Sequence, residues 1–435
     1  MAHYQCLNFR FQSFLRSFSF LRRSLKRTPV TVTGSSSSRS VLLNTSLSTS
    51  PSKGYCSLSR TSSSSPLPRA VPAPPVSERT FREEVVVDAT DGVERARGGS
   101  SPSGGRLMLV DGTSIIYRSY FKLLAKLHHG YLKHADGNGD WALTIFTALS
   151  LILDVLELIP SHVVVVFDHD GVPFGQTSIV AKENVMAKGL NFRHNLYPSY
   201  KSNRDPTPDT VVQGLQYLKA SLKAMSIKVI EVPGVEADDV IGTLAVKSVN
   251  DGFKVRVVSP DKDFFQILSP SVRLLRIAPR GAEMVSFGME EFANKYGALK
   301  PSQFVDVISL MGDKSDNIPG VDGIGDVRAV QLITKFGTLE NLLESVDQVG
   351  DARVREALRA NADQARLSKE LALLRCDLPS YMVPFDMRDM KFRTPQDNGE
   401  KFKSLLTAIS AYAEGSSADP IIRRVLNLWK KLEAQ

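Results

Sequence analysis

The stretch RLMLVDGTSIIYRSYF at residues 106–121 places a short apolar run directly before an acid and a glycine. The run 106–111 is typical of a buried parallel strand. The residues after it have the spacing of a helix, with Thr113 or Ser114 available as the N-cap. The stretch therefore predicts the first strand–helix unit of an α/β fold, with Asp111 at the carboxyl end of the strand.

The same alternation continues for about 150 residues. Helical patterns follow at 141–159, 210–225 and 236–249, and strand patterns at 162–168, 227–232 and 253–259. From about Met289 onward the pattern becomes wholly helical, and IIRRVLNLWKKLEAQ at 421–435 is a further predicted helix. We expect an α/β domain with a mostly parallel sheet flanked by helices, followed by a helical region.

The net charge of +8 comes from one end of the chain. Residues 1–77 hold ten Lys and Arg and no Asp or Glu, which leaves 44 bases and 46 acids for the rest. Three Cys at wide spacing exclude a disulfide framework and a Cys-based zinc site. No apolar run approaches 18 residues, so a membrane span is not expected.

The acid-free segment is rich in Arg and Ser, which is typical of an organellar transit peptide. We interpret 1–77 as a disordered transit peptide for a mitochondrion, a chloroplast or both. A basic tail that contacts nucleic acid is the alternative. The Gly, Ser and Pro that end 78–105 indicate a flexible linker.

Carboxylates fall where an α/β sheet binds ligands. Asp111 and Asp168 end predicted strands, Asp261 and Asp263 follow another, and a predicted helix starts at EADD. Two more acids, in GDKSDN, share one face if that segment is helical. Each acid alone is ordinarily a turn former or helix cap. The set of candidate ligands is Asp111, Asp168, Glu236, Asp238, Asp239, Asp261, Asp263, Asp313 and Asp316.

So many carboxylates cannot share one pocket unaided, because two unit charges 4 Å apart repel by about 4 kcal/mol at an effective dielectric near 20. Either some acids protonate or cations lie among them. An all-oxygen ligand set suits Mg²⁺ or Mn²⁺. Two such ions form the usual clamp for in-line displacement at phosphorus.

Six segments, in order, resemble the 5′-nuclease domain of bacterial DNA polymerase I and the wider flap endonuclease and 5′–3′ exonuclease family. They are LMLVDGTSIIYRSYF, VVVVFD, FRHNLYPSYKSNRDPTP, EVPGVEADDVIGTLA, VVSPDKDFFQIL and LMGDKSDNIPGVDGIG, within about 106–380. The resemblance implies a PIN-like nuclease fold, two Mg²⁺ ions that Mn²⁺ can replace, and all nine acids as ligands. It gives catalytic roles to Asp111, Asp168, Asp239, Asp261 and Asp313.

The resemblance also implies a DNA-binding set. FRHNLYPSYKSNR looks like the base of the family's helical arch, where basic side chains contact phosphate and Tyr197 or Tyr200 stacks on a base or simply packs. IPGVDGIG looks like a helix–hairpin–helix turn, whose carbonyls hold K⁺ in relatives. The implied DNA contacts are Arg118, Arg193, Tyr200, Lys201, Arg204, Gly320, Gly323, Gly325 and Arg328.

Two features depart from the family pattern. Asp322 and Asp326 stand in the turn where relatives often carry Lys or other basic or uncharged residues, so duplex contacts are expected to be weaker or shifted. An extra segment at 173–190 lengthens the region before the arch base, and its role is open. The expected domains are 106–287 (α/β, with the arch at about 170–207), 288–384 (helical, DNA-binding) and 385–435 (a C-terminal extension).

The resulting expectation is a stand-alone, monomeric organellar enzyme that cleaves 5′ flaps or RNA primers in DNA replication and repair. Only about 50 residues follow position 385, too few for a polymerase domain. DNA with a flap, nick or primer junction is the expected partner, with an organellar polymerase or ligase. A non-catalytic nucleic-acid-binding module and an organellar RNase are the alternatives.

Overall fold

The computed structural model describes residues 105–128, 140–169, 191–277, 284–413 and 416–434, all in the unit Ser100–Gln435. The predicted transit peptide, nearly all of the linker and the extra segment at 173–190 lie outside these ranges. None of the described helices is long and apolar enough to span a membrane.

The described residues form a six-stranded sheet in the order β3-β2-β1-β4-β5-β6. All pairs are parallel except β5 with β6. Leu109 in the central strand pairs with Val164 on one side and Val257 on the other. The strands are β1 (Arg106–Asp111), β2 (His162–Phe167), β3 (Lys228–Glu231), β4 (Lys254–Val258), β5 (Val272–Ile277) and β6 (Met284–Phe287).

Helices cover both faces of the sheet because side chains alternate along each strand. Leu107 and Leu109 face a core that includes α6 and the helical region, whereas Met108 and Val110 face α2, α3 and α5. These strand residues are fully buried, as expected of a covered parallel sheet. The helices of this domain are α2 (Gly112–His128), α3 (Asp140–Leu156), α4 (Phe192–Leu196), α5 (Asp209–Ala224) and α6 (Ala237–Asn250).

Phe265, just after β4, joins the sheet to the helical region. Its ring stacks on Phe287 at 4.5 Å and meets Phe292 and Phe304 edge-on at 5.9 and 5.3 Å. Each fully buried ring contributes about 2–3 kcal/mol of apolar burial. The helices beyond it are α7 (Met289–Tyr296), α8 (Phe304–Met311), α9 (Asp326–Phe336), α10 (Leu339–Glu344), α11 (Ala352–Ala360) and α12 (Ala362–Ala372).

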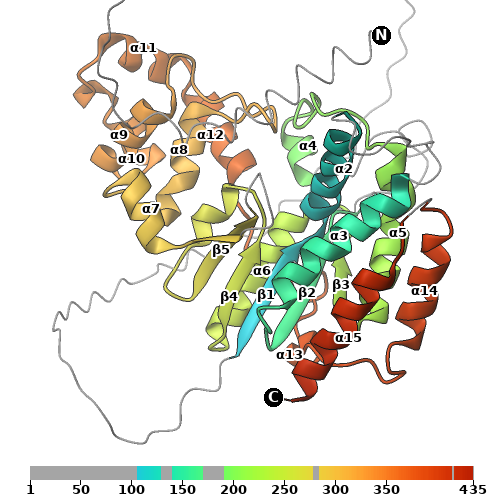
Figure 1. Ribbon diagram of the computed structural model, residues 1–435. Coiled ribbons are helices and arrows are strands. Elements are labelled where there is room, and N and C mark those ends of the chain that lie inside the picture. Colours follow the sequence, from blue (N-terminus) through green and yellow to red (C-terminus); the bar gives the residue numbers. More distant parts are fainter. Residues whose placement is uncertain (1–104, 129–139, 170–190, 278–283, 414–415, 435) are drawn as a thin grey trace, which may run out of the picture. The chain divides into compact units, whose positions relative to one another are not determined.

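The last helices return to the α/β domain. Figure 1 shows α15 (Asp419–Glu433) beside α3 and α14 (Glu400–Ser410) beside α5, and α13 (Met387–Met390) contacts β2. Trp429 and Phe402 are buried in the core of this layer. Arg424 donates to Asp154 at 2.7 Å and to Glu157 at 2.8 Å. The C-terminal residues therefore complete one face of the sheet domain.

The fold class predicted from the sequence is confirmed, and local details differ from prediction. The segment around Asp313 and Asp316 is not helical. Asp313 and Ile318 exchange backbone hydrogen bonds of 3.0 and 2.8 Å, which closes a tight turn directly after α8. The two carboxylates therefore project from a loop rather than from one helix face. Strands β5 and β6 and helix α14 were not anticipated.

Candidate metal centre and nucleic-acid interface

The predicted acids meet at the carboxyl edge of the sheet. Asp111 is the last residue of β1, Asp168 directly follows β2, and Asp261 lies three residues after β4. The Asp168 carboxylate accepts a 2.8 Å hydrogen bond from the Ala237 amide at the start of α6, which connects two of the contributing elements. Because β1 lies beside both β2 and β4, the parallel order brings these three acids to one place.

Helix α6 contributes two more acids from its first turn. Glu236 is its N-cap residue and Asp238 lies in its first turn, where the helix dipole favours negative charge. Burial raises the pKa of Asp238 well above 3.8, and the charges of the nearby Asp111, Asp261 and Asp168 raise it further. The start of α6 is thus part of the same acidic cluster.

The remaining acids come from two loops, one after β4 and one after α8. Asp263 lies in the turn after β4, and Asp313 and Asp316 lie in the turn after α8. Lys262 bridges the two loops, with its Nζ 3.0 Å from Asp313 Oδ2. Charges on Asp316 and Asp313 raise the pKa of Asp261 in turn, after the larger effect of its own burial. Both loops therefore face the acids of the strands.

Burial and mutual repulsion control the protonation of the cluster. Burial raises the pKa of Asp111 to about 6, opposed by hydrogen bonds from Ser114 and Ser259. Burial, followed by neighbouring carboxylates, holds the pKa of Asp263 well above 3.8. Glu236 is the opposite case, because Lys201 and Arg193 outweigh its burial and lower its pKa to about 2. The protein by itself neutralises only part of this cluster.

The donor set suits a hard cation. Every candidate ligand offers carboxylate oxygens, and Asp263 Oδ1 is buried without a hydrogen-bond partner. Among the described residues, no three acidic, His or Cys side chains already stand in a closed metal-binding arrangement. The acids are therefore gathered in one region and are chemically suited to Mg²⁺ or Mn²⁺.

Three side chains of one short segment contact these acids, namely Tyr200, Lys201 and Arg204. Lys201 Nζ is 2.7 Å from Glu236 Oε1, and Arg204 forms a close ion pair with Asp316. The Tyr200 ring is buried and its hydroxyl donates toward Glu236 and Asp316 at 3.3 and 3.2 Å. The prediction of base stacking by Tyr200 is therefore revised, because its ring is buried in the core.

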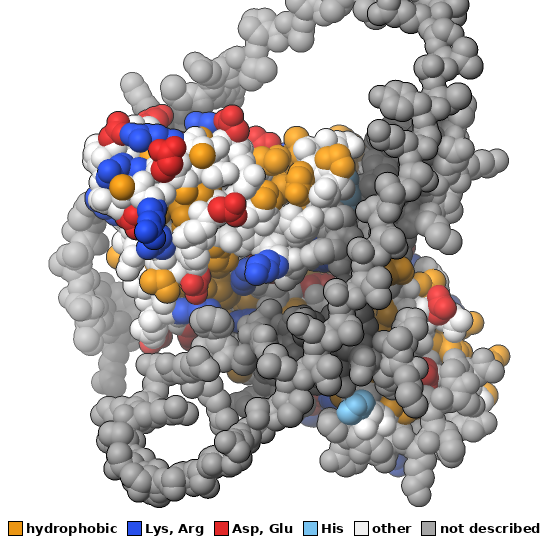
Figure 2. Space-filling view, turned by 90° about the horizontal axis from the view of Figure 1, so that it is seen from above, with side chains coloured by type: hydrophobic (Ala, Val, Ile, Leu, Met, Phe, Trp, Pro, Cys, Tyr) orange, Lys and Arg blue, Asp and Glu red, His pale blue; other side chains and the backbone are white. Residues whose placement is uncertain are grey.

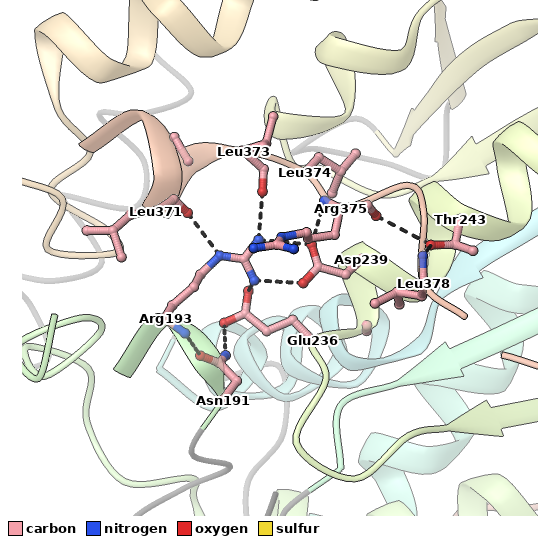
Figure 3. A network of polar contacts seen from close by, with 12 residues as sticks. Asn191, Arg193, Glu236, Asp239, Thr243, Leu371, Leu373, Leu374, Arg375 and Leu378 are labelled. Atoms are coloured by element: carbon pink, nitrogen blue, oxygen red, sulfur yellow. Dashed lines mark hydrogen bonds and ion pairs between the residues drawn. The ribbon is translucent and has the colours of Figure 1, made fainter. Parts of the chain in front are cut away.

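Arg193 and Asp239 pair with each other instead of with ligands (Figure 3). Arg193 donates from both terminal nitrogens to the Asp239 carboxylate, at 2.7 and 2.9 Å. Their exposed fractions are 4% and 1%. Arg193 was expected to contact phosphate, and Asp239 was expected to bind metal and take part in catalysis. Both expectations are revised, because the two side chains form a buried ion pair with each other.

The turn between α8 and α9 was expected to grip duplex DNA and K⁺. The Gly320 amide donates to Ser368 Oγ at 3.1 Å, and its carbonyl accepts from Gln364 at 2.8 Å. The predicted contact of the Gly320 amide with phosphate is therefore revised, because Ser368 already accepts from it, whereas K⁺ binding at this turn stays a prediction. Gly323 and Gly325 are exposed, and their contact with the duplex stays a prediction.

Two predicted bases lie at the edges of the site. Arg328 is half-exposed and pairs with Asp351 at 3.4 Å, beside the α8–α9 turn. Arg118 on α2 lines a small cavity with Ser259 and Pro260, next to Asp111. From above, Figure 2 shows Lys and Arg mixed with Asp and Glu over the helical part, rather than in one continuous basic patch.

Several contributors were missed from the sequence. The Ser114 hydroxyl donates to the Asp111 carboxylate in a close contact, and the Ser259 hydroxyl donates to it at 2.8 Å. The Asn191 side chain donates to Glu236 at 2.7 Å. A signal existed for Ser114, because it stands three residues after Asp111 at a helix start. Nothing local distinguishes Ser259 or Asn191, since their partners are far away in the sequence.

Residues 106–297 match the N-terminal resolvase-like domain of 5′–3′ exonucleases, and residues 299–398 match their C-terminal SAM-fold domain. Residues 106–398 therefore belong to the 5′–3′ exonuclease family. The resemblance seen in the sequence is confirmed. Helices α14 and α15 follow the last matched residue of this 5′–3′ exonuclease region.

Relatives of the 5′–3′ exonuclease region are much longer proteins. DNA polymerase I of Bacillus caldotenax is 39% identical over 275 residues, 63% of this chain and 28% of that protein. For the thermostable DNA polymerase I of Thermus thermophilus the values are 38%, 63% and 29%. The chain thus spans less than a third of either relative. A solved bacteriophage T5 flap endonuclease complex with DNA and metal ions is 19% identical, with 75% of this chain and 99% of that one covered and a TM-score of 0.46.

Proposed function

We propose that the protein is a metal-dependent 5′–3′ exonuclease or structure-specific flap endonuclease that hydrolyses DNA phosphodiesters at 5′ flaps and RNA primers. The observation that carries this proposal is the convergence of eight carboxylates at the carboxyl edge of the sheet, with raised pKa values at several of them. Membership of residues 106–398 in the 5′–3′ exonuclease family supports it.

The carboxylates of this cluster would hold two Mg²⁺ ions, which Mn²⁺ can replace. Bound divalent ions supply electrostatic stabilisation of the charge that develops on the phosphoryl oxygens. The proposed ligands exclude the paired Asp239. They are Asp111, Asp168, Glu236, Asp238, Asp261, Asp263, Asp313 and Asp316.

The chain's own bases would bind the substrate. Lys201 and Arg204 lie on Glu236 and Asp316, which are among the proposed ligands. If divalent ions neutralise these carboxylates, Lys201 and Arg204 can each exchange a carboxylate partner for a substrate phosphate. Gly323, together with Gly325 and Arg328 beside it, would contact the duplex from the exposed side of the α8–α9 turn.

We further propose that the enzyme works in a mitochondrion or chloroplast, with the polymerase or ligase of that organelle. The acid-free Arg- and Ser-rich composition of residues 1–77 supports targeting. Residues 1–105 fused to a fluorescent protein should direct it to one of these organelles. Diffuse fluorescence throughout the cell would leave the basic-tail interpretation in place.

Cleavage assays with the full chain test the activity. Wild-type protein should cut a labelled 5′-flap DNA in Mg²⁺, and Asp168→Asn and Asp313→Asn should abolish cleavage. Asp363→Asn, a fully exposed acid on α12, is the matched control and should cleave normally. Full cleavage by both site variants would refute the assignment. No cleavage of flap, nicked or gapped DNA by wild type would favour the non-catalytic module, and preference for an all-RNA substrate would favour the RNase.

A further inference from the structure

Arg193 joins three parts of the chain that are far apart in the sequence (Figure 3). Besides both oxygens of Asp239, it donates from Nε to the Leu371 carbonyl at 2.9 Å and from Nη2 to the Leu373 carbonyl at 2.8 Å. Asp239 completes the network by accepting from the Arg375 amide at 2.9 Å. The network connects α4, the first turn of α6 and the end of α12.

Stability alone is a weak reason for such a pair. Removing two charges from water costs several kcal/mol, and apolar residues of similar volume often serve a core equally well. The pair is nevertheless well bonded, since the planar guanidinium makes a bidentate contact with Asp239 and two more of its five N–H groups reach carbonyls. A buried pair with this many hydrogen bonds favours a single geometry.

The neighbouring group is Glu236. Arg193 Nη1 lies 3.4 Å from Glu236 Oε2, while Asn191 Nδ2 donates to Glu236 Oε1 at 2.7 Å. Asn191 is itself oriented, because its Oδ1 accepts from the Arg193 amide at 2.9 Å. Both oxygens of Glu236 are thus contacted by one short segment. Glu236 is also the N-cap residue of α6, three positions before Asp239.

We propose that Arg193 and Asp239 form a latch whose role is to position Glu236 for cation binding. The latch comprises the bidentate pair and the carbonyls of Leu371 and Leu373. It holds the segment that begins at Asn191 against the start of α6 and the end of α12. The inference rests on the proposed function, since it assumes that Glu236 is a ligand. Arg193 is then a positioning residue and Asp239 is not a ligand.

Two other roles make different predictions. If Arg193 bound substrate phosphate, its removal would weaken DNA binding in Ca²⁺ and flatten the salt dependence, with ion binding unchanged. If Asp239 were a ligand, its removal would weaken ion binding even where Arg193 is already absent. Under the latch, either change acts through Glu236. The two losses therefore overlap and do not add.

The test measures Mn²⁺ binding by the DNA-free full chain, using electron paramagnetic resonance of free Mn²⁺. The variants are Arg193→Ala, Arg193→Lys, Asp239→Asn and the double variant of Arg193→Ala with Asp239→Asn. Arg366→Ala on α12, whose side chain is 55% exposed and pairs with an exposed acid, is the matched control. Thermal unfolding of each variant monitors folding, and DNA binding is measured in Ca²⁺ over a range of salt.

We expect Arg193→Ala to weaken Mn²⁺ binding about tenfold, the usual effect of losing a group that orients a ligand. Arg193→Lys should bind with intermediate affinity, because it keeps the charge and loses the bidentate fork. This variant keeps the test valid if Arg193→Ala unfolds. The double variant should bind no more weakly than the worse single variant, and Arg366→Ala should match wild type.

Unchanged Mn²⁺ affinity in Arg193→Ala and Arg193→Lys would overturn the latch, as would additive losses in the double variant. A wild-type chain that binds no Mn²⁺ would overturn it as well, since nothing would then be positioned. A wild type that binds Mn²⁺ but cleaves no DNA would refute the proposed nuclease and leave the latch testable. The two failures are therefore distinguishable.

Discussion

Lys201 Nζ lies 2.7 Å from Glu236 Oε1 and 3.6 Å from Asp316 Oδ2, so a single ammonium links the start of α6 to the turn after α8. Its backbone is strained to reach this place. Lys201 has φ 53°, and its amide donates to the Asp316 carbonyl at 2.9 Å. A left-handed non-glycine residue costs about 1 kcal/mol or more, so the contacts of Lys201 must hold it in place. Lys201 is thus an internal counter-ion of the acidic cluster.

Replacing Lys201 should separate stability from ion binding. Lys201→Met should destabilise the metal-free protein by about 2 kcal/mol, because charged hydrogen bonds to buried carboxylates are lost. The same change should tighten Mn²⁺ binding, since Glu236 loses a competing cation. Lys314→Met, an exposed base in the same turn, is the control and should change neither property. Weaker Mn²⁺ binding in Lys201→Met would contradict the counter-ion role.

The stability of the metal-free protein should depend on pH in an unusual direction. The pKa of Asp111 is raised by burial from 3.8 to about 6, so the folded state binds its proton more tightly than the unfolded state. This contribution is fully present below about pH 4 and is lost as the pH rises through about 6. Burial also raises the pKa values of Asp238 and Asp263, so their contributions to stability are likewise lost as the pH rises.

In the presence of a chelator, the midpoint temperature of thermal unfolding should therefore fall as the pH rises from about 4 to about 6, and it should continue to fall above that. Mg²⁺ should restore the midpoint at neutral pH, and Asp111→Asn should flatten the curve. Glu236 acts oppositely, since its pKa is lowered to about 2, and its contribution is lost only as the pH falls below about 4.5. A midpoint that rises steadily from pH 4 to pH 7 would contradict the raised pKa values.

Gly320 is predicted to be essential for the turn that carries Asp313. It has φ 67°, and a Cβ there would lie 2.3 Å from the Gly312 amide nitrogen. Gly320→Ala should cost about 2–4 kcal/mol and displace the Asp313 loop, with loss of cleavage. Gly323→Ala is the matched control, because Gly323 has φ 81° and open space around it. Equal unfolding midpoints for the two variants would contradict this account.

Gly399 should show that the C-terminal helices belong to the core. Its φ is 79°, and a Cβ there would lie 2.1 Å from Trp429 Cζ3. Gly399→Ala should lower the free energy of unfolding by about 2–3 kcal/mol, through overpacking as well as backbone strain. Gly252→Ala has the same kind of φ, 83°, and nothing within 4 Å, so it isolates the backbone effect. Equal losses for both would show that Trp429 moves aside freely.

Much of the fold was predictable because its signals are local. The apolar runs ending at Asp111 and Asp168 indicated parallel strands, and the spacing around Trp429 indicated a C-terminal helix, all of which the structure contains. The edge strand β6 escaped prediction because its middle residues are exposed and its burial pattern is weak. The turn at Asp313 escaped because a closing contact with Ile318 overrides any helical spacing.

The sequence by itself determined the fold class, the family and the place of most acids, because strand ends and helix starts are encoded by neighbouring residues. Only the tertiary structure decided which acid belongs to which chemistry. Asp238 and Asp239 are adjacent in the chain, yet successive helical positions point about 100° apart. One carboxylate therefore joins the cluster, and the other meets Arg193 and the end of α12. That difference depends on partners up to 136 residues away, which no local pattern can report.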